Sequence, residues 1–311
     1  MSQYIKPPGR PLRVGLVLRL GRAPAKLNLV LELTGRRANG YHELAAISHT
    51  ISWSDVIGLE PLARGAPAAD TCQLLVYGPH SAQVPHGPEN IVLKAARLLS
   101  DQGLGQATSR IVLEKRIPTQ SGLGGGSADA AALIRLTAPD APDSALEEVA
   151  LACGADVPFA LTGGAARVGG IGELLEPLPP LSDRLFLVVV LAAISTAAAY
   201  AAVQTKDFGD GSRADRLARS LQAGTVPDPD LYGSDLQPAA LRISATLRQR
   251  LRALRQATPG TPWAMTGSGG AFFTPIDDPN RAVNIARTVA LACPGALVRT
   301  VISEPGWPDR I

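Results

Sequence analysis

Residues 120–127 read Gln120-Ser-Gly-Leu-Gly-Gly-Gly-Ser127, between an apolar run at 110–114 and an Ala-rich stretch at 128–136. These flanking patterns predict a strand before the glycines and a helix after them. Four glycines in five positions let the backbone come close to a ligand and turn successive N–H groups toward it. The N-terminus of the following helix adds a partial positive charge, so the segment is typical of a phosphate-binding loop. A flexible turn is the alternative interpretation.

Single residues exclude two familiar kinds of phosphate loop. A Walker A loop ends in Gly-Lys-Ser/Thr, and no lysine follows Gly126. A dinucleotide fingerprint that begins at Gly122 requires a third glycine where Ser127 stands. The acidic residues that follow it, Glu147 and Glu148, lie in a helical pattern rather than at the end of a strand. Both familiar interpretations therefore fail.

The composition of the 311-residue chain excludes several classes of protein. Hydrophobic residues make up 46% and charged residues 18%, which allows a sizeable core and argues against intrinsic disorder. A net charge of +3 is too small to indicate nucleic-acid binding. The three cysteines are far apart and the four histidines show no ligand spacing, so neither a disulfide framework nor a zinc site is predicted. We expect a reducing, cytoplasmic compartment.

Two apolar segments raise the question of export or membrane insertion. The run at 14–18 is shorter than the roughly 7–15 residues of a secretory signal's apolar region. The uncharged segment 185–203 approaches the roughly 20 residues that span a bilayer. However, its first part is rich in Val and Leu and its second part in Ala. We therefore predict a buried strand that leads into a helix, and we expect no membrane association.

The rest of the pattern mixes strands and helices without regular alternation, which favours an α+β fold over a doubly wound sheet. Asn39-Gly40 predicts a turn, and Pro177–Pro180 is our candidate domain boundary. We expect further strands at 12–20, 47–53, 71–77, 271–274 and 296–303, a loop at 61–70, and helices at 90–100, 144–153, 241–257 and 280–293. The arginines of 241–257 are expected on a solvated face.

A strand at 25–33 is predicted to alternate strictly between its two faces. One face would carry Leu27, Leu29, Leu31 and Leu33, and the other Lys26, Asn28, Val30 and Glu32. The alternation thus predicts that the side chains of Lys26 and Asn28 lie side by side.

Three motifs in sequence order resemble those of the GHMP kinases, which include galactokinase, homoserine kinase and mevalonate kinase. Pro24-Ala-Lys-Leu-Asn-Leu29 precedes the glycine-rich loop, the loop motif runs from Pro118 to Ala131, and Met265-Thr-Gly-Ser-Gly-Gly270 follows it. The segments 34–44, 154–159 and 170–173 are similar to those of the members that phosphorylate a CDP-linked methylerythritol. The ordered motifs cover about residues 23–273, although 134–148 is shorter than in the family.

The resemblance implies that ATP transfers its γ-phosphoryl group to the 2-hydroxyl of that substrate, with Mg²⁺ neutralising phosphate charge. Asp156 matches the catalytic aspartate, which takes the hydroxyl proton, and Lys26 matches the catalytic lysine. Taken alone, Asp156 is more typical of a helix cap and Lys26 of a solvated strand lysine.

The resemblance also implies the binding residues. ATP-binding positions are matched by Asn90, Lys115, Pro118, Gly122, Leu123, Gly124, Gly125, Gly126 and Ser127. Asn90 is equally suited to cap a helix, and Ser127 could both cap its helix and reach a phosphate or Mg²⁺. Substrate-binding positions are matched by Asn28, Tyr41, His42, Thr196 and Tyr200. Tyr41 and Tyr200 would enclose the cytosine base and His42 would bond its edge, although Tyr41 alone is also an ordinary hairpin aromatic.

The fold implied by the resemblance has two domains. Residues 1–180 would form an ATP-binding domain of the ribosomal S5 domain 2-like type, with 1–22 as an unassigned extension, and 181–311 a ferredoxin-like domain. The expected partners are ATP and the CDP-linked methylerythritol, and a homodimer is a further hypothesis. Two alternatives stay open: another GHMP kinase, or a nucleotide-binding protein without turnover.

Overall fold

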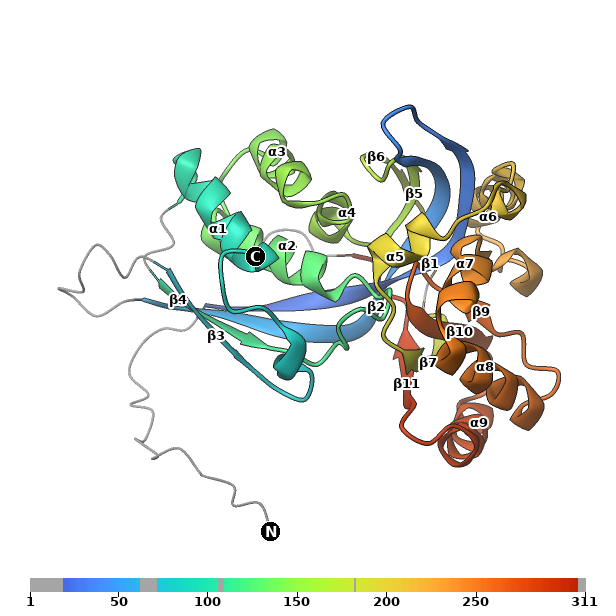
Figure 1. The fold of residues 1–311 in the computed structure, drawn as a ribbon. Helices are drawn as coiled ribbons and strands as arrows, with labels where there is room; N and C mark the ends of the chain where they lie inside the picture. Colours follow the sequence, from blue (N-terminus) through green and yellow to red (C-terminus); the bar gives the residue numbers. More distant parts are fainter. Residues whose placement is uncertain (1–18, 62–71, 106–108, 182, 307–311) are drawn as a thin grey trace, which may run out of the picture.

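A long hairpin, β1 (Arg19–Arg36) and β2 (His42–Pro61), runs through the molecule and pairs antiparallel along most of its length. The structure is a computed structural model that describes residues 19–61, 72–105, 109–181 and 183–306. The hairpin turns at the predicted Asn39-Gly40, where Gly40 has a φ of +90°. Figure 1 shows the two strands, in blue, extending from one half of the molecule into the other. Both halves are therefore built on the same pair of strands.

The hairpin is the centre of a seven-stranded sheet whose main path has the order β3-β4-β2-β1-β8. β5 pairs with the first part of β2, and β6 pairs with β5. The other strands are β3 (Cys72–Tyr77), β4 (Ser109–Glu114), β5 (Ala165–Gly170), β6 (Leu174–Leu178) and β8 (Gly233–Ser234). The chain leaves this sheet at Pro177–Pro180, but β8 returns to it and pairs with β1 at Val30 and Leu31.

Four helices pack together on one face of this sheet, as Figure 1 shows. They are α1 (Ile91–Asp101), α2 (Gly125–Thr137), α3 (Asp143–Cys153) and α4 (Val157–Thr162). Alanines dominate the buried side of α2, which allows this helix to lie close to the hairpin. The glycine-rich loop that precedes α2 is thereby held at the centre of the molecule.

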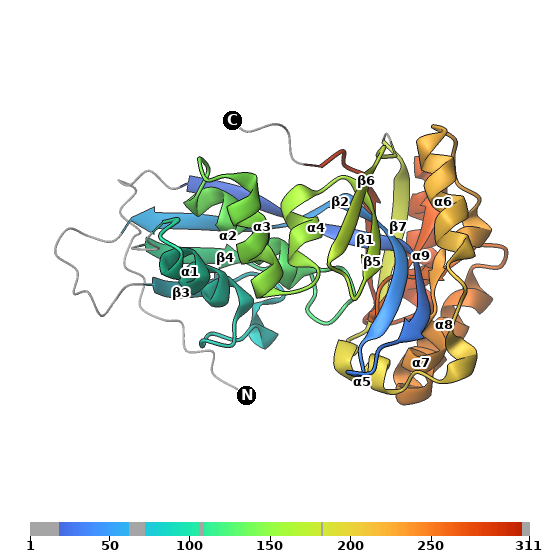
Figure 2. The same cartoon turned by 90° about the horizontal axis from the view of Figure 1, so that it is seen from above.

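The second sheet is fully antiparallel, with the order β11-β7-β10-β9. Its strands are β7 (Leu185–Ala192), β9 (Ala264–Met265), β10 (Gly270–Ile276) and β11 (Leu297–Ile302). The helices of this half are α5 (Thr196–Ala201), α6 (Ser212–Gln222), α7 (Leu236–Ile243), α8 (Ala245–Ala257) and α9 (Pro279–Ala292). Figure 2 shows α8 and α9 on the side of this sheet that faces away from the first half. Single turns of 3-10 helix lie at Ser81–Gln83, Thr205–Asp207 and Pro229–Leu231.

Segment 185–203 is confirmed as a strand followed by a helix, here β7 and α5. No helix in the described part of the chain is long and apolar enough to cross a membrane.

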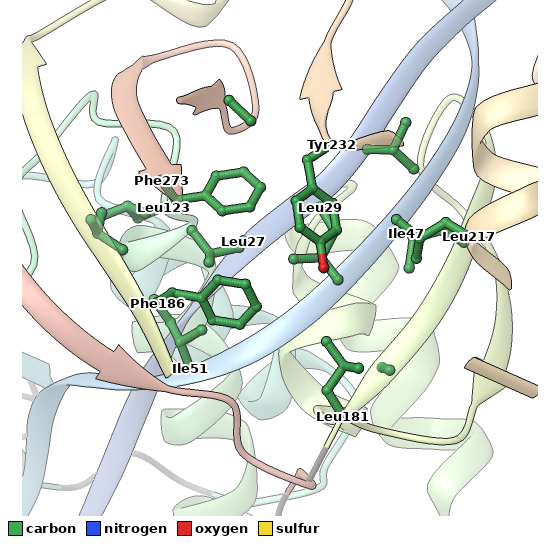
Figure 3. Packing of buried hydrophobic residues seen from close by; sticks show 14 of the residues in the cluster. Leu27, Leu29, Ile47, Ile51, Leu123, Leu181, Phe186, Leu217, Tyr232 and Phe273 are labelled. Carbon is green, nitrogen blue, oxygen red and sulfur yellow. The ribbon is translucent and has the colours of Figure 1, made fainter. Parts of the chain in front are cut away.

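An apolar cluster between the two sheets joins the halves. Leu27 and Ile51 of the hairpin lie in it beside Phe186 of β7 and Phe273 of β10, as Figure 3 shows. The two phenylalanine rings meet edge to face, with centroids 5.8 Å apart. Because Leu27 points into this cluster, its neighbours Lys26 and Asn28 point to the opposite face of the strand.

The alternation predicted for 25–33 is wrong beyond Asn28. The register between β1 and β2 shifts between Asn28 and Val30, which is a β-bulge. Val30 consequently packs in the same cluster as Leu29, whereas Leu31 belongs to a different cluster. The predicted faces are exchanged for Val30, Leu31, Glu32 and Leu33.

The single helix predicted at 241–257 is two helices, α7 and α8. Ser244 between them has an extended backbone, and its hydroxyl accepts a hydrogen bond from Leu247 N at 3.1 Å, which begins α8 with an N-cap. The expected solvated arginine face is also wrong in part, because Arg242 pairs with Asp207. The strands predicted at 25–33 and 47–53 are longer in the structure, Arg19–Arg36 and His42–Pro61, because they pair along most of the hairpin. The other predicted elements within the described residues agree within a few residues. Residues 12–18 and 62–70 lie outside the described residues.

Candidate active site

A cavity of about 960 Å³ lies where the glycine-rich loop, the hairpin and the C-terminal half meet. Its walls come from β1, the loop at 118–127, the start of α4, α5 and the loop at 267–268. All the predicted site residues line it: Lys26, Asn28, Tyr41, His42, Asn90, Lys115, Pro118, Gly122, Leu123, Gly124, Gly125, Gly126, Ser127, Asp156, Thr196 and Tyr200. The structure thus brings together residues that are far apart in the sequence.

The glycine-rich loop contains two positions that only glycine fills without strain. Gly122 and Gly124 have φ values of +89° and +70°. A Cβ atom on Gly124 would lie 2.9 Å from Cγ of Lys26, so the loop passes directly over that lysine. The chain becomes helical at Gly125, and the first N–H groups of a helix have no intrahelical partner. The lining of the cavity therefore includes a helix N-terminus suited to a phosphate group.

The same loop is hydrogen-bonded to the C-terminal half, which argues against a flexible turn. Ala271 N donates to the Ser121 carbonyl at 3.1 Å, and Ile194 N donates to the Gln120 carbonyl at 3.0 Å. A Cβ on Gly269 would overlap the Ser121 carbonyl group, so the two glycine loops touch backbone to backbone. Gln120 takes a positive φ of +53°, which is a strained conformation for a residue with a side chain.

Lys26 and Asp156 meet at the wall of the cavity. Lys26 Nζ lies 3.6 Å from Asp156 Oδ2, with the lysine side chain 10% exposed and that of the aspartate 51% exposed. Lys26 is thus buried under the loop, and its interpretation as a solvated lysine is wrong. Asp156 precedes α4, but its side chain makes no capping hydrogen bond within the described residues, so the cap interpretation is wrong too. Its carboxylate is available to take a proton from a group in the cavity.

Asn28 fixes the ammonium group of Lys26 from the other side. Lys26 Nζ donates to Asn28 Oδ1 at 2.5 Å, which confirms that the two side chains lie side by side. Asn28 Nδ2 donates to Ser48 Oγ at 2.9 Å, and Asn28 N donates to Thr266 Oγ1 at 2.8 Å. Ser48 carried no signal in the sequence, because only the strand register brings it here. Thr266 was noted only as part of the motif at 265–270, without a role of its own.

Lys115 lies in a buried cluster of charges. Its Nζ donates to Asp55 Oδ2 at 2.5 Å and to Asp129 Oδ2 at 2.7 Å. Burial lowers the pKa of Lys115, but the negative charges of Asp129 and Asp55 outweigh it and the pKa is raised. Burial raises the pKa of Asp129 well above its usual value. A Cβ on Gly125 would lie 3.0 Å from Lys115 Nζ, so this cluster packs directly against the glycine-rich loop.

Sequence reasoning missed both carboxylates of this cluster. Nothing in the sequence marked either of them as a partner of Lys115, because β2 mixes polar and apolar residues around Asp55 and Asp129 lies in an Ala-rich helix.

Asn90 acts as a helix cap, as one of its two interpretations predicts. Its Oδ1 accepts from Val92 N at 2.8 Å and its Nδ2 donates to the Pro85 carbonyl at 2.6 Å. Because both ends of the amide have partners, Asn90 shapes this wall of the cavity through the start of α1. A direct contact between Asn90 and ATP stays a prediction.

Three ring side chains, Tyr41, His42 and Tyr200, line the cavity, and Phe208 packs behind them. The ring centroids of His42 and Tyr200 are 5.4 Å apart, and those of His42 and Phe208 are 5.9 Å apart. Tyr41 is 59% exposed beside them. Burial, and to a lesser extent the charge of Arg36, lowers the pKa of His42, which favours the neutral imidazole. A neutral imidazole offers one donor and one acceptor to a polar ring edge.

Thr196 connects this part of the cavity to the C-terminal loop. Its hydroxyl lies 2.7 Å from the hydroxyl of Ser268, and both residues line the cavity. α5 begins at Thr196 and carries Tyr200 on its next turn. Burial and the charge of Asp156 raise the pKa of Tyr200, so its hydroxyl stays protonated.

Oxygen donors suited to Mg²⁺ line the cavity near the loop. They are the hydroxyl of Ser127 and the carboxylates of Glu89 and Asp156. Among the described residues, no group of three or more His, Cys, Asp and Glu could hold a metal ion by itself. Mg²⁺ commonly takes only one or two protein ligands and completes its shell with phosphate oxygens and water. These donors therefore fit an ion that arrives with a bound phosphate.

Comparisons with known proteins show which family this chain resembles. The family pattern described as "GHMP kinases N terminal domain" matches residues 90–164. A protein named 4-diphosphocytidyl-2-C-methyl-D-erythritol kinase from Xanthobacter autotrophicus is 34% identical over 309 residues, covering 93% of this chain and 97% of that protein. One of the same name from Paramagnetospirillum magneticum is 38% identical over 265 residues, covering 81% and 86%.

Solved structures confirm the predicted fold class. A crystal structure of 4-(cytidine 5'-diphospho)-2C-methyl-D-erythritol kinase matches with a TM-score of 0.71 and 33% identity, covering 92% of this chain and 100% of that one. A homoserine kinase from Cytophaga hutchinsonii matches with a TM-score of 0.67 and 17% identity, covering 97% and 98%. The second likeness concerns the fold alone.

Proposed function

The chain belongs to the 4-diphosphocytidyl-2-C-methyl-D-erythritol kinases of the GHMP kinase family, and we propose that Lys26 and Asp156 carry out its phosphoryl transfer. The activity is ATP-dependent phosphorylation of that substrate in the methylerythritol phosphate route to isoprenoid precursors. One observation carries the proposed roles: the two side chains, distant in the sequence, lie 3.6 Å apart beneath the glycine-rich loop.

In the proposed mechanism, the oxygen of the substrate's 2-hydroxyl attacks the γ-phosphorus of ATP, and Asp156 removes the proton from that hydroxyl. The bond to the bridging oxygen breaks, and ADP leaves with the electron pair. Lys26 lies within reach of both the Asp156 carboxylate and the loop, so its positive charge can stabilise the negative charge on the transferring phosphoryl group. A positioned base of this kind contributes about 10²–10⁴-fold to the rate.

The ATP phosphates are proposed to lie on Gly122–Ser127, where the first N–H groups of α2 would bind them. Asn90, Lys115 and Pro118 would enclose the adenosine side. Ser127 would contribute its hydroxyl to Mg²⁺, which neutralises phosphate charge when bound. This placement puts the γ-phosphate next to Lys26, because Gly124 lies directly over that lysine.

The acceptor is proposed to lie where the ring side chains line the cavity. Tyr41 and Tyr200 would enclose the cytosine ring, His42 would bond its polar edge, and Thr196 and Asn28 would contact the rest of the molecule. Base stacking on an aromatic ring contributes about 1–3 kcal/mol. Acceptors without a base, such as homoserine and mevalonate, would lose this contribution and bind poorly.

An assay of ADP release with the three acceptors tests the acceptor site, and one variant tests the mechanism. We expect turnover with the CDP-linked methylerythritol and none with homoserine or mevalonate. Asp156→Asn should abolish turnover and leave ATP affinity within about threefold, because the amide keeps the shape of the carboxylate but cannot take the proton. A kcat like that of the wild type would remove Asp156 from the mechanism.

A further inference from the structure

A buried hydroxyl behind the Lys26–Asp156 pair has no role in the mechanism above. Ser48, on β2, is 2% exposed and lies directly opposite Asn28 in the register of the hairpin. Its Oγ accepts a hydrogen bond from Asn28 Nδ2 at 2.9 Å. Ser48 does not line the cavity, so it can act on the reaction only through another residue.

The orientation of the Asn28 amide decides how Lys26 is held. A lysine ammonium has only donors, so it requires an acceptor from its neighbour. Asn28 presents Oδ1 to Lys26 Nζ at 2.5 Å, and this orientation turns Nδ2 toward Ser48. If the amide were reversed, Nδ2 of Asn28 and Nζ of Lys26, which both only donate, would face each other. The Ser48 hydroxyl therefore accepts the hydrogen bond that Nδ2 donates when the Asn28 amide is oriented to present Oδ1 to the Lys26 ammonium group.

The backbone of Asn28 is also fixed. Asn28 N donates to Thr266 Oγ1 at 2.8 Å, and Thr266 is fully buried in the C-terminal loop. With the backbone held there and Nδ2 held by Ser48, Oδ1 has a defined position next to the cavity. Lys26 Nζ, at the end of a flexible side chain, takes its position from that oxygen and from Asp156.

We propose that Ser48 is a positioning residue for Lys26: through the amide of Asn28, it holds the ammonium group beside Asp156 and below the glycine-rich loop. This inference rests on the proposed function, because it requires Lys26 to act in phosphoryl transfer. Without the hydroxyl, the amide can rotate and Nζ loses its fixed acceptor. A displacement of about 1 Å at a reacting group can lower the rate about 10²-fold.

The test is a double-mutant cycle in the full chain, with ADP release measured on the CDP-linked methylerythritol. Ser48→Ala should lower kcat about 10- to 100-fold and leave the KM for ATP within about threefold. In an Asn28→Ala background, the same change should alter kcat by less than about twofold, because its route to Lys26 is already removed. Ser54→Ala is the matched control: Ser54 is buried on the same strand and accepts from Arg22 at 2.9 Å, so kcat should not change.

The outcomes separate this inference from the proposed function. Wild-type kcat in Ser48→Ala, together with an inactive Lys26→Met, would overturn the role of Ser48 and leave that of Lys26. An active Lys26→Met would overturn the proposed catalytic role itself. An equal loss of kcat in the wild-type and Asn28→Ala backgrounds would indicate general damage to the fold and would also overturn the inference.

If Ser48→Ala unfolds below the assay temperature, Ser48→Cys replaces it. Cysteine fills a similar volume with a much weaker hydrogen-bonding group. The inference then requires a lowered kcat in the cysteine variant, and wild-type turnover would contradict it.

Discussion

Removing the carboxylate of Asp55 is expected to destabilise the protein strongly. Asp55 is completely buried and accepts three hydrogen bonds. The donors are Lys115 Nζ at 2.5 Å, Arg116 N at 2.5 Å and Ile117 N at 2.7 Å. Asp55→Ala therefore removes one charged partner of Lys115 and the acceptor of two backbone N–H groups.

The magnitude follows from these three contacts. A buried donor left without an acceptor costs about 1–3 kcal/mol, and breaking a buried ion pair costs about 3–5 kcal/mol. The two effects overlap, and Asp129 still pairs with Lys115, so we expect a loss of about 4 kcal/mol. Total stabilities are about 5–15 kcal/mol, so this is a substantial part of the whole.

Urea denaturation at pH 7.5, followed by circular dichroism, measures this loss. Glu60→Ala is the matched control, because Glu60 lies on the same strand and makes a partly exposed ion pair with Arg110 at 3.4 Å. Such a pair contributes about 0–1 kcal/mol. A loss below about 1 kcal/mol in Asp55→Ala would show that the Asp55–Lys115–Asp129 cluster does not stabilise the fold as argued.

Three further predictions concern pH, the loop and the acceptor. Burial lowers the pKa of His49 to about 4, so its contribution to stability is present above pH 6.5 and is lost as the pH falls toward 4. Between pH 7.5 and pH 5, urea titrations should show a loss of stability that is about 2 kcal/mol smaller in His49→Gln than in the wild type. Gly124→Ala should lower the melting temperature and kcat, because the new Cβ would press on Lys26. Gly126→Ala is the control and should not lower the melting temperature, because its Cβ would contact Ile91 at an ordinary distance of 3.6 Å. Tyr41→Ala should raise the KM for the CDP-linked substrate about tenfold or more, with the KM for ATP and the melting temperature unchanged; an unchanged KM would remove Tyr41 from the base site.

Features with a local cause were predictable from the sequence. The strand, glycine cluster and helix around residues 120–137 were found as predicted, because their signals lie within one short segment. The cap at Asn90 and the shared face of Lys26 and Asn28 have the same kind of local origin. The meeting of Lys26 with Asp156 was not accessible from spacing, and only the resemblance to the GHMP kinases indicated it.

Features that depend on pairing between distant segments were missed. The bulge after Asn28 is a property of the register between β1 and β2, and the sequence of neither strand alone predicts it. One local feature was missed as well: the break at Ser244, whose hydroxyl caps α8, is concealed by a helical pattern that continues across it. Asp55 and Asp129 reach Lys115 only in the folded chain, so the cluster under the loop had no sequence signal. The roles assigned to the ATP-binding and substrate-binding residues stay predictions until ligands or variants test them.

The contact between the two glycine loops means that both halves of the molecule shape the proposed nucleotide site. Ser121 and Gln120 accept backbone hydrogen bonds from Ala271 and Ile194, and Gly269 packs against the same stretch. An amino-terminal fragment ending near Pro180 would carry every residue of the phosphate cradle and still lack the scaffold that shapes it. Splitting this kinase between its sheets should therefore abolish nucleotide binding, and adding the missing half in trans should restore it.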